Sequence, residues 1–373
     1  MNKQVIALAL MAGGTSLAQA QSNVTIYGSL DQYLGYISST SGTHVFGIND
    51  GSVLRSRLGF RGVEELGDGY QAKFNLEQGL NADTGASADS NHLFDRQAWV
   101  GINTPLGEFR LGRQNTEIFF IGGAIDYTER TTFGSVVNTF GVPSRYDNDM
   151  SYKTPRLAGF QGALHYALGE QAGGGVSQSA VMQFSLDFSQ GPYRIGYAGL
   201  SAKPAPSGSV QEKIQYHNVY ADYDYGQGKV YFAYVHSNNN TASANGLTAA
   251  TILSNVANPN NLFAGTDKNA NRYFNIYQLS GDYRINQQVR VGALYGVIKD
   301  TTGGNAGAKG GNIGVFYDLS KRTTLYTFAS VLSNAANAGF RFSGSAAPAA
   351  NLAGADVNGQ RLSGLQTGFV HKF

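Results

Sequence analysis

The stretch VTIYGSLDQYLGY at residues 24–36 alternates between apolar and polar side chains. Its even positions are mostly apolar: Val24, Ile26, Leu30, Leu34 and Tyr36. Its odd positions are more polar: Thr25, Tyr27, Ser29, Asp31 and Tyr33. A period of two places these sets on opposite faces of a β-strand. The same alternation recurs at 70–77, 181–188 and 312–319.

About sixteen segments of this kind follow one another along the chain. They span roughly 23–37, 52–64, 69–81, 93–103, 107–115, 144–154, 159–168, 179–189, 192–202, 212–225, 229–238, 272–284, 288–299, 311–319, 323–332 and 361–373. A soluble β-sandwich also has alternating strands, but this count argues against it. An even count brings both termini to one side, as in bacterial single-chain outer-membrane barrels.

The connections between the segments alternate in length. Short turns rich in Gly, Pro and Asp are expected at 65–69, 104–107, 190–192, 226–228 and 320–322, since these residues accept tight-turn geometry. Long loops are expected at 38–51, 116–143, 169–178, 237–271 and 333–360. Short periplasmic turns opposite long extracellular loops are typical of an outer-membrane barrel.

The front of the chain differs from its body. Lys3, the apolar stretch 5–11 and the Ala18-Gln19-Ala20 cleavage site predict a secretory signal peptide over residues 1–20, removed on export. The mature chain, 21–373, is expected to be one barrel domain, because no linker divides it. No later window approaches the roughly 18 apolar residues that a membrane helix needs. The expected location is the outer membrane of a Gram-negative bacterium.

Composition excludes several classes of function. Lys3 is the one charged residue in 1–20, so the mature chain has 26 basic and 25 acidic residues. This nearly neutral balance lacks the positive charge that is typical of a nucleic-acid-binding protein. Cysteine is absent, and the six histidines show no metal-ligand spacing. No nucleophile with a positioned base and no phosphate-cradling glycine loop stands out. We therefore expect no enzyme, no cofactor and no metal.

Several motifs, in order, resemble the trimeric general porins of Gram-negative bacteria, in particular the β-proteobacterial branch. They are VTIYG at 24–28, SRLGFRGVEELGDG at 56–69, RQAWVG at 96–101, GEFRLGR at 107–113, RYDN at 145–148, DLSKRT at 318–323 and the terminal Phe373. The resemblance covers the whole mature chain. It implies a sixteen-stranded transmembrane antiparallel β-barrel that assembles as a homotrimer, in contact with outer-membrane lipid and lipopolysaccharide. It also implies that the third long loop, about 116–143, folds into the pore.

A pore selects by its width and by the charges at its narrowest point. Alternation places Arg55, Arg57 and Arg61 opposite the apolar Leu54, Leu58 and Phe60. At mid-bilayer each arginine would cost roughly 2–4 kcal/mol, so these side chains are expected to face water or the pore. By the same argument Lys73, Glu77 and Arg110 point inward.

The resemblance places an arginine cluster across from acidic groups on or near the inward loop. Arg57, Arg61, Arg145 and Glu77 match those positions, and Glu117, Asp126 and Glu129 are the acids of the loop. The alternative is that one or more of these arginines is only a structural salt-bridge partner.

Two arginines depart from the alternation. Arg96 lies at an even position, in phase with Ala98, Val100 and Ile102, so alternation predicts that its side chain points outward. Alternation also predicts an outward side chain for Arg113. Either a β-bulge shifts the phase or Gln97 is the lumen residue.

The sequence therefore predicts a water-filled channel for passive diffusion of small hydrophilic solutes and ions. Basic lining candidates outnumber acidic ones, which favours a modest anion preference. A substrate-specific channel and a surface adhesin built on the same barrel remain as alternatives, the latter through loops such as 237–271.

Overall fold

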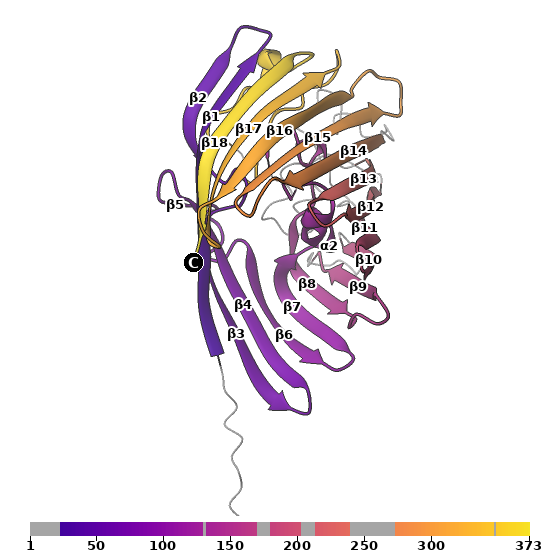
Figure 1. Cartoon of the computed structure of the whole chain (residues 1–373). Helices are drawn as coiled ribbons and strands as arrows, with labels where there is room; N and C mark the ends of the chain where they lie inside the picture. Colours follow the sequence, from indigo (N-terminus) through magenta and orange to yellow (C-terminus); the bar gives the residue numbers. More distant parts are fainter. Residues whose placement is uncertain (1–22, 130–131, 170–179, 203–212, 239–272, 347) are drawn as a thin grey trace, which may run out of the picture.

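The computed structural model describes residues 23–129, 132–169, 180–202, 213–238, 273–346 and 348–373 (Figure 1). The predicted signal peptide and nearly all of the 237–271 loop lie outside these residues. No helix among the described residues is long and apolar enough to cross a membrane.

The described chain is built almost entirely of strands. These are β1 (Asn23–Ser39), β2 (His44–Asp50), β3 (Arg57–Gly67), β4 (Tyr70–Asn81), β5 (Ala86–Ser87), β6 (Gln97–Thr104), β7 (Gly107–Asn115), β8 (Arg145–Lys153), β9 (Phe160–Ala167), β10 (Val181–Gln190), β11 (Tyr193–Ala202), β12 (Ile214–Asp224), β13 (Lys229–Ser237), β14 (Phe274–Arg284), β15 (Val289–Asp300), β16 (Ala308–Asp318), β17 (Thr323–Asn334) and β18 (Arg361–Lys372). The helical pieces are α2 (Glu117–Phe120), η1 (Ile121–Ala124), α3 (Val136–Phe140) and η2 (Gly354–Asp356).

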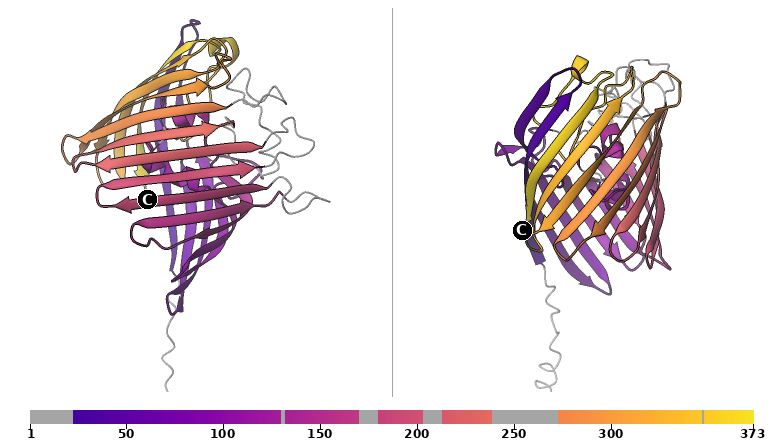
Figure 2. Two further views of the ribbon diagram at one scale, coloured as in Figure 1. Left: turned by 90° about the vertical axis from the view of Figure 1, so that its right-hand side faces the viewer. Right: turned by 45° about the horizontal axis from the view of Figure 1, so that its top comes forward.

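Neighbouring strands pair antiparallel around a closed barrel. The first strand, β1, pairs with the last, β18, from Ser29↔Lys372 to Ser39↔Leu362, so the sheet has no open edge there. The sheet contains 18 strands. Both β2 and β3 pair with β1 and continue one another, and β5 lies within a connection, which leaves the sixteen wall strands that the sequence predicted. Figure 2 shows this wall from two further directions.

The second wall strand departs from the sequence prediction. The segment 38–51 was expected to be a loop, but β2 occupies His44–Asp50 and pairs with Gln32–Ser38 of β1. The strand expected at 52–64 begins only at Arg57. Between β2 and β3 the backbone does not continue the pairing with β1. There the Asp31 carboxylate accepts hydrogen bonds from the amides of Val53 at 2.7 Å and Leu54 at 2.6 Å.

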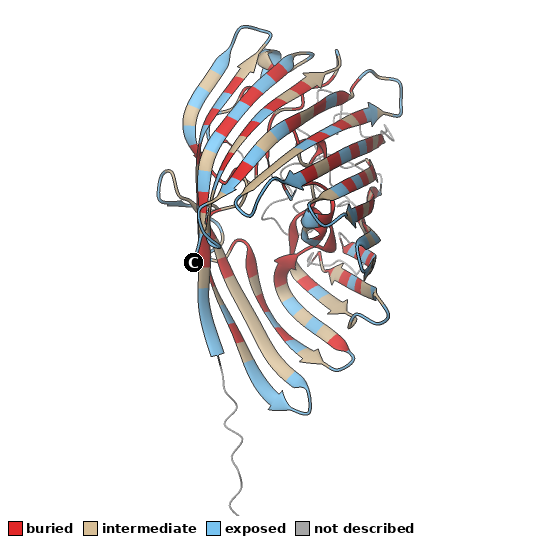
Figure 3. Cartoon of the chain, in the orientation of Figure 1, coloured by how far each residue is buried: buried red, intermediate tan, exposed pale blue. Residues whose placement is uncertain are grey.

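Inward and outward residues alternate along the wall as the sequence predicts. On β10, for example, Met182, Phe184 and Leu186 are exposed on the outer face, while Gln183, Ser185 and Asp187 are buried. Figure 3 shows the resulting bands of buried and exposed residues on successive strands. An apolar exterior and a polar interior suit a barrel that meets lipid outside and water inside.

The two ends of the barrel have different connections. At one rim the turns are short, as between β3 and β4, β6 and β7, or β10 and β11. At the other rim lie the inward loop (residues 116–143) and the last loop (residues 335–360). Both termini of the barrel, Asn23 and Phe373, lie at the rim with the short turns, as an even number of strands requires.

The largest apolar cluster lies inside the barrel, where the inward loop meets the last loop. Phe133 of the inward loop stacks on Phe342 of the last loop with ring centroids 5.0 Å apart. Phe140 contacts Phe340 and Phe274 of β14 at 6.5 and 5.5 Å. All five rings are buried, so this part of the lumen is filled by side chains and the passage is displaced toward the opposite wall.

Candidate functional site: the pore constriction

The inward loop begins with a short capped helix. The hydroxyl of Thr116 accepts a hydrogen bond from the amide of Phe119 at 2.9 Å, which caps α2 and turns the chain into the barrel. Figure 1 shows α2 within the ring of strands. The prediction that the third long loop folds into the pore is confirmed.

Buried hydrogen bonds hold the loop against the inner wall. The Tyr127 hydroxyl donates to Asn312 of β16 at 2.8 Å. The Val136 amide donates to Gln278 of β14 at 2.7 Å, and the Phe133 amide donates to Gln366 of β18 at 2.9 Å. Because each wall partner is buried with the loop group that it bonds, these contacts fix the loop's position in the lumen.

The three predicted acids of the loop take different roles. Asp126 is buried and accepts hydrogen bonds from Ser135 at 2.9 Å and Gln278 at 2.8 Å, so it holds the loop rather than facing the arginines. Glu117 is also buried and lies 3.0 Å from the Lys153 ammonium. Glu129, which has a left-handed φ of 56°, is exposed on the loop. It is the most exposed of these three acids.

On the wall across from the inward loop, basic side chains lie around the carboxylate of Glu77 on β4. Arg96 donates to its carboxylate at 2.6 Å, and Arg57 of β3 lies 3.7 Å away. The Tyr27 hydroxyl donates to the same carboxylate at 2.9 Å. The carboxylate is almost fully buried, so the pair of arginines supplies the compensation that a buried charge needs.

Arg96 and Arg113 both face inward, which corrects the outward placement that simple alternation gives them. Arg96 precedes β6, which begins at Gln97, so strand parity does not apply to it; Gln97 is also buried on the inner face. Arg113 lies within a register shift in β7 between Gly112 and Gln114. This bulge turns its side chain inward, where it donates to the Asp95 carbonyl at 2.5 Å and pairs with the Asp147 carboxylate.

Arg145 and Arg55 complete the cluster. Arg145, at the start of β8, is buried; its Nε donates to Asn115 at 3.3 Å and its guanidinium lies 5.6 Å from the Phe119 ring. No carboxylate pairs with it among the described residues. Arg55, in the break between β2 and β3, donates to Asn81 at 2.8 Å and lies 3.8 Å from Asp50.

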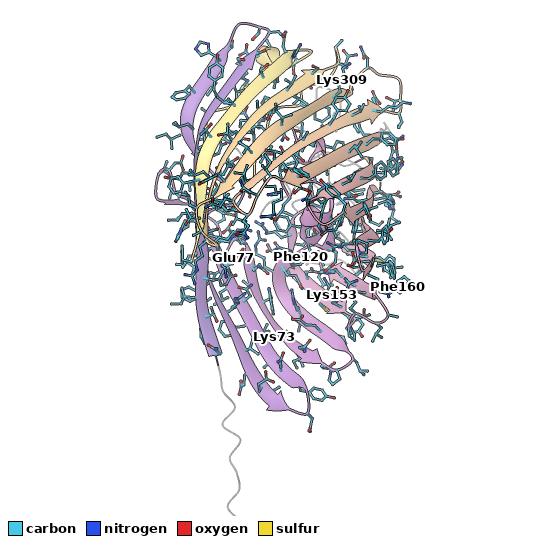
Figure 4. The ribbon with its side chains drawn as sticks, viewed as in Figure 1. Lys73, Glu77, Phe120, Lys153, Phe160 and Lys309 are labelled. Atoms are coloured by element: carbon cyan, nitrogen blue, oxygen red, sulfur yellow. The ribbon has the colours of Figure 1, made fainter. Side chains whose placement is uncertain are left out.

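The other predicted lining residues lie nearer the rim with the short turns. Lys73 lies 3.8 Å from Glu108, and Arg110 donates to the same carboxylate at 3.0 Å while covering the Trp99 ring at 4.2 Å. Arg61 is exposed and lies 5.2 Å from the Tyr27 ring. Figure 4 labels Lys73 and Glu77 on the same strand.

Several charged residues of this wall were not among the predicted candidates. They are Asp95, Lys153, His165, Asp187 and Arg194. Alternation carries a signal for four of them. Asp187 shares the inward parity of Gln183, and Arg194 lies between the outward Tyr193 and Ile195. Lys153 and His165 likewise have the inward parity of β8 and β9. Asp95 lies in an irregular segment before β6, where alternation gives no signal. Among the described residues, no group of three or more His, Asp or Glu side chains is arranged to hold a metal ion.

Comparison with known proteins identifies the family. Residues 7–337 match the family model described as Gram-negative porin. The chain belongs to the Gram-negative porin family. An outer membrane porin protein of Bordetella pertussis is 29% identical to this porin over 373 residues, which cover 90% of this chain and 95% of the relative. The family consists of channels rather than enzymes, and this porin lies in the outer membrane.

Two solved structures share the fold of this porin. An anion-selective porin from Comamonas acidovorans matches with a TM-score of 0.76 at 23% identity, over 95% of this chain and 100% of that chain. A trimer form of OmpT, an outer membrane protein of Vibrio cholerae, matches with a TM-score of 0.62 at 15% identity, over 94% of this chain and 99% of that chain.

Proposed function

We propose that this porin forms a water-filled channel for passive diffusion of small hydrophilic solutes and ions, with a modest preference for anions. The observation that carries the preference is Arg145, which contributes a positive charge beside the inward loop without a paired carboxylate among the described residues. It lies close enough to Arg96 and Arg113 for the three charges to interact. Charges in the low-dielectric wall of a narrow passage act strongly on ions within it.

The other charges around the constriction largely offset one another. Five arginines meet there, namely Arg55, Arg57, Arg96, Arg113 and Arg145. Asp50, Glu77 and Asp147 pair with them directly, and Asp83, Asp89 and Asp95 lie close enough to interact with one or more of them. Most of the arginines are paired with carboxylates, so the unpaired Arg145 gives only a modest preference for anions. The name of the Comamonas acidovorans relative, an anion-selective porin, agrees in sign.

Reversal potentials in a potassium chloride gradient across a planar bilayer test the proposal. The wild-type channel should pass chloride more readily than potassium, and Arg145→Gln should move the permeability ratio toward unity. Lys309→Gln, which removes an exposed cation from the outer face of β16, should leave the ratio as in the wild type. A cation preference in the wild type would contradict the proposal.

A general pore and a substrate-specific channel differ in how the rate of solute entry depends on solute size. Swelling of liposomes that contain the porin should fall smoothly with the size of neutral sugars. A sugar that enters much faster than its size allows would instead indicate a specific channel.

The mature porin is proposed to begin at Gln21, after cleavage of residues 1–20, and to assemble as a homotrimer. The outward apolar rows would then contact outer-membrane lipid and lipopolysaccharide. The trimer form of the Vibrio cholerae relative supports the assembly. Mass spectrometry of the purified protein checks the cleavage site.

A further inference from the structure

A recess opens beneath the inward loop, on the side toward the short turns. It has a volume of about 220 Å³ and lies between α2, η1 and the inner faces of β7 to β12. Its lining includes Arg110, Glu117, Phe120, Lys153, Asp187 and Arg194. Pockets for drug-sized ligands occupy roughly 300–1,000 Å³, so this recess suits a smaller molecule.

Phe120 gives the recess an apolar surface that the fold does not cover. Its side chain is 43% exposed, whereas its neighbours Ile118 and Ile121 are buried. The ring meets Phe119 edge-on at 6.5 Å, and the Lys153 ammonium lies 5.5 Å from its centre. An exposed ring in a water-filled lumen does not contribute to the core, and it offers a face on which another ring can pack.

The charges around the recess are unbalanced in favour of positive ones. Three basic side chains line the recess, Arg110, Lys153 and Arg194, together with two carboxylates, Glu117 and Asp187. Asp187 alone is shared by Arg156 and Arg194.

Donors also remain for an incoming anion. Arg194 donates to Asp187 through Nε at 2.7 Å, and its terminal nitrogens have no hydrogen-bond partner among the described residues. Arg110 bonds Glu108 through Nε and Nη2, and its Nη1 is likewise without a partner there. A guanidinium with open nitrogens is suited to a carboxylate.

We propose that the recess binds small carboxylates that carry an aromatic ring as they pass through the pore. The ring packs on Phe120, and the carboxylate lies among Lys153, Arg110 and Arg194. This inference rests on the proposed diffusion function and names a solute class that the pore retains briefly.

Block of the single-channel chloride current by benzoate and by acetate tests the inference, because the two anions share a carboxylate and differ by the ring. Benzoate should reach half-block at a concentration about two- to tenfold lower than acetate, which is the range expected for one aromatic contact. Phe120→Leu should remove most of this difference, and Phe120→Tyr, which keeps the ring, should retain it. Phe160→Leu is the matched control, since Phe160 is 50% exposed on the outer face (Figure 4).

The carboxylate half of the site has its own pair of variants. Lys153→Gln should raise the half-blocking concentration of both acids, whereas Lys309→Gln on the outer face should raise neither. Equal block by benzoate and acetate in the wild type would overturn the inference, and so would a Phe160→Leu effect as large as that of Phe120→Leu. Loss of the benzoate preference in Phe120→Tyr would do the same.

The reversal potential in potassium chloride alone separates this inference from the proposed function. An anion-preferring pore that blocks equally with both acids would overturn the recess and leave the proposed function intact. A cation-preferring pore that still favours benzoate would overturn the proposed anion preference and leave the recess in place.

Discussion

Glu117 ties the root of the inward loop to the wall through a single carboxylate. It lies 3.0 Å from the Lys153 ammonium and 3.6 Å from the His165 ring. Burial alone would raise the pKa of Glu117, but the interaction with His165 and the charge of Lys153 outweigh it and lower the pKa to about 2. A folded-state pKa below the ordinary 4.5 means that ionisation stabilises the folded loop above about pH 4.5. This stabilisation is lost as the pH falls from about 4.5 toward 2.

Glu117→Gln should mimic the protonated carboxyl at every pH. At pH 7 the free energy of unfolding should fall by about 3 kcal/mol, the order of magnitude that such a pKa shift implies. The acid-dependent loss of stability between pH 4.5 and 2 should shrink by the same amount. Unfolding of the detergent-solubilised protein across this pH range measures both effects. Glu129→Gln, on the exposed acid of the same loop, should behave as the wild type, and an unchanged acid profile in Glu117→Gln would contradict the argument.

Alternation could predict which regular strand residues face inward, and it failed where the backbone is irregular. Arg57 and Lys73 lie within ordered ladders, and the structure places both on the inner face. Arg113 does not follow the pattern because β7 has a bulge at Gly112, whose φ is +125°. A glycine within a strand was the available signal for that bulge. The roles of these residues in selectivity stay predictions until currents are measured.

The inward loop and the last loop support one another through aromatic packing. Phe133 and Phe342 stack with an interplanar angle of 10°, and Phe342 is 1% exposed. Asn138 also donates to the Gly344 carbonyl at 3.3 Å, so the two loops share polar contacts as well. These contacts between the loops add to the wall hydrogen bonds that hold the inward loop.

Phe342→Ala should therefore loosen both loops at once. Truncation of a buried phenylalanine costs about 3–5 kcal/mol, so the unfolding midpoint should fall and the single-channel current should become noisier. Phe46→Ala serves as the control, because Phe46 on β2 is 68% exposed and its removal leaves no cavity. Equal noise in the two variants would show that the last loop does not hold the inward loop.

The strand order could be predicted almost completely, because alternation and turn residues recur in every hairpin. The second wall strand was the exception. Its first part, β2, is a short strand that contains Gly47 and follows a polar turn, so its sequence predicts a loop. The break after it depends on the carboxylate of Asp31, a contact between residues 22 and 23 positions apart that local patterns do not contain.

At the scale of the whole molecule, one outer face carries more polar residues than lipid favours. Thr327 of β17 and Thr367 of β18 are directly paired, and the Thr327 hydroxyl donates to that of Thr367 at 3.3 Å. Gln32 of β1 points to the same side, next to Phe369. On β10, by contrast, the outward positions are Met182, Phe184, Leu186 and Phe188. A polar stripe across the closing strands is expected where another subunit, rather than lipid, covers the wall.

A bulky apolar substitution separates these two surroundings. Lipid accommodates a tryptophan on the outer face, whereas a packed contact between subunits does not. Thr367→Trp should therefore convert the proposed trimer to folded monomers, while Leu186→Trp on the apolar face should leave the assembly intact. Light scattering of the detergent complexes gives the assembly state, and circular dichroism confirms that the barrel persists. If Thr367→Trp remains trimeric, the closing strands face lipid and the subunits meet elsewhere on the wall.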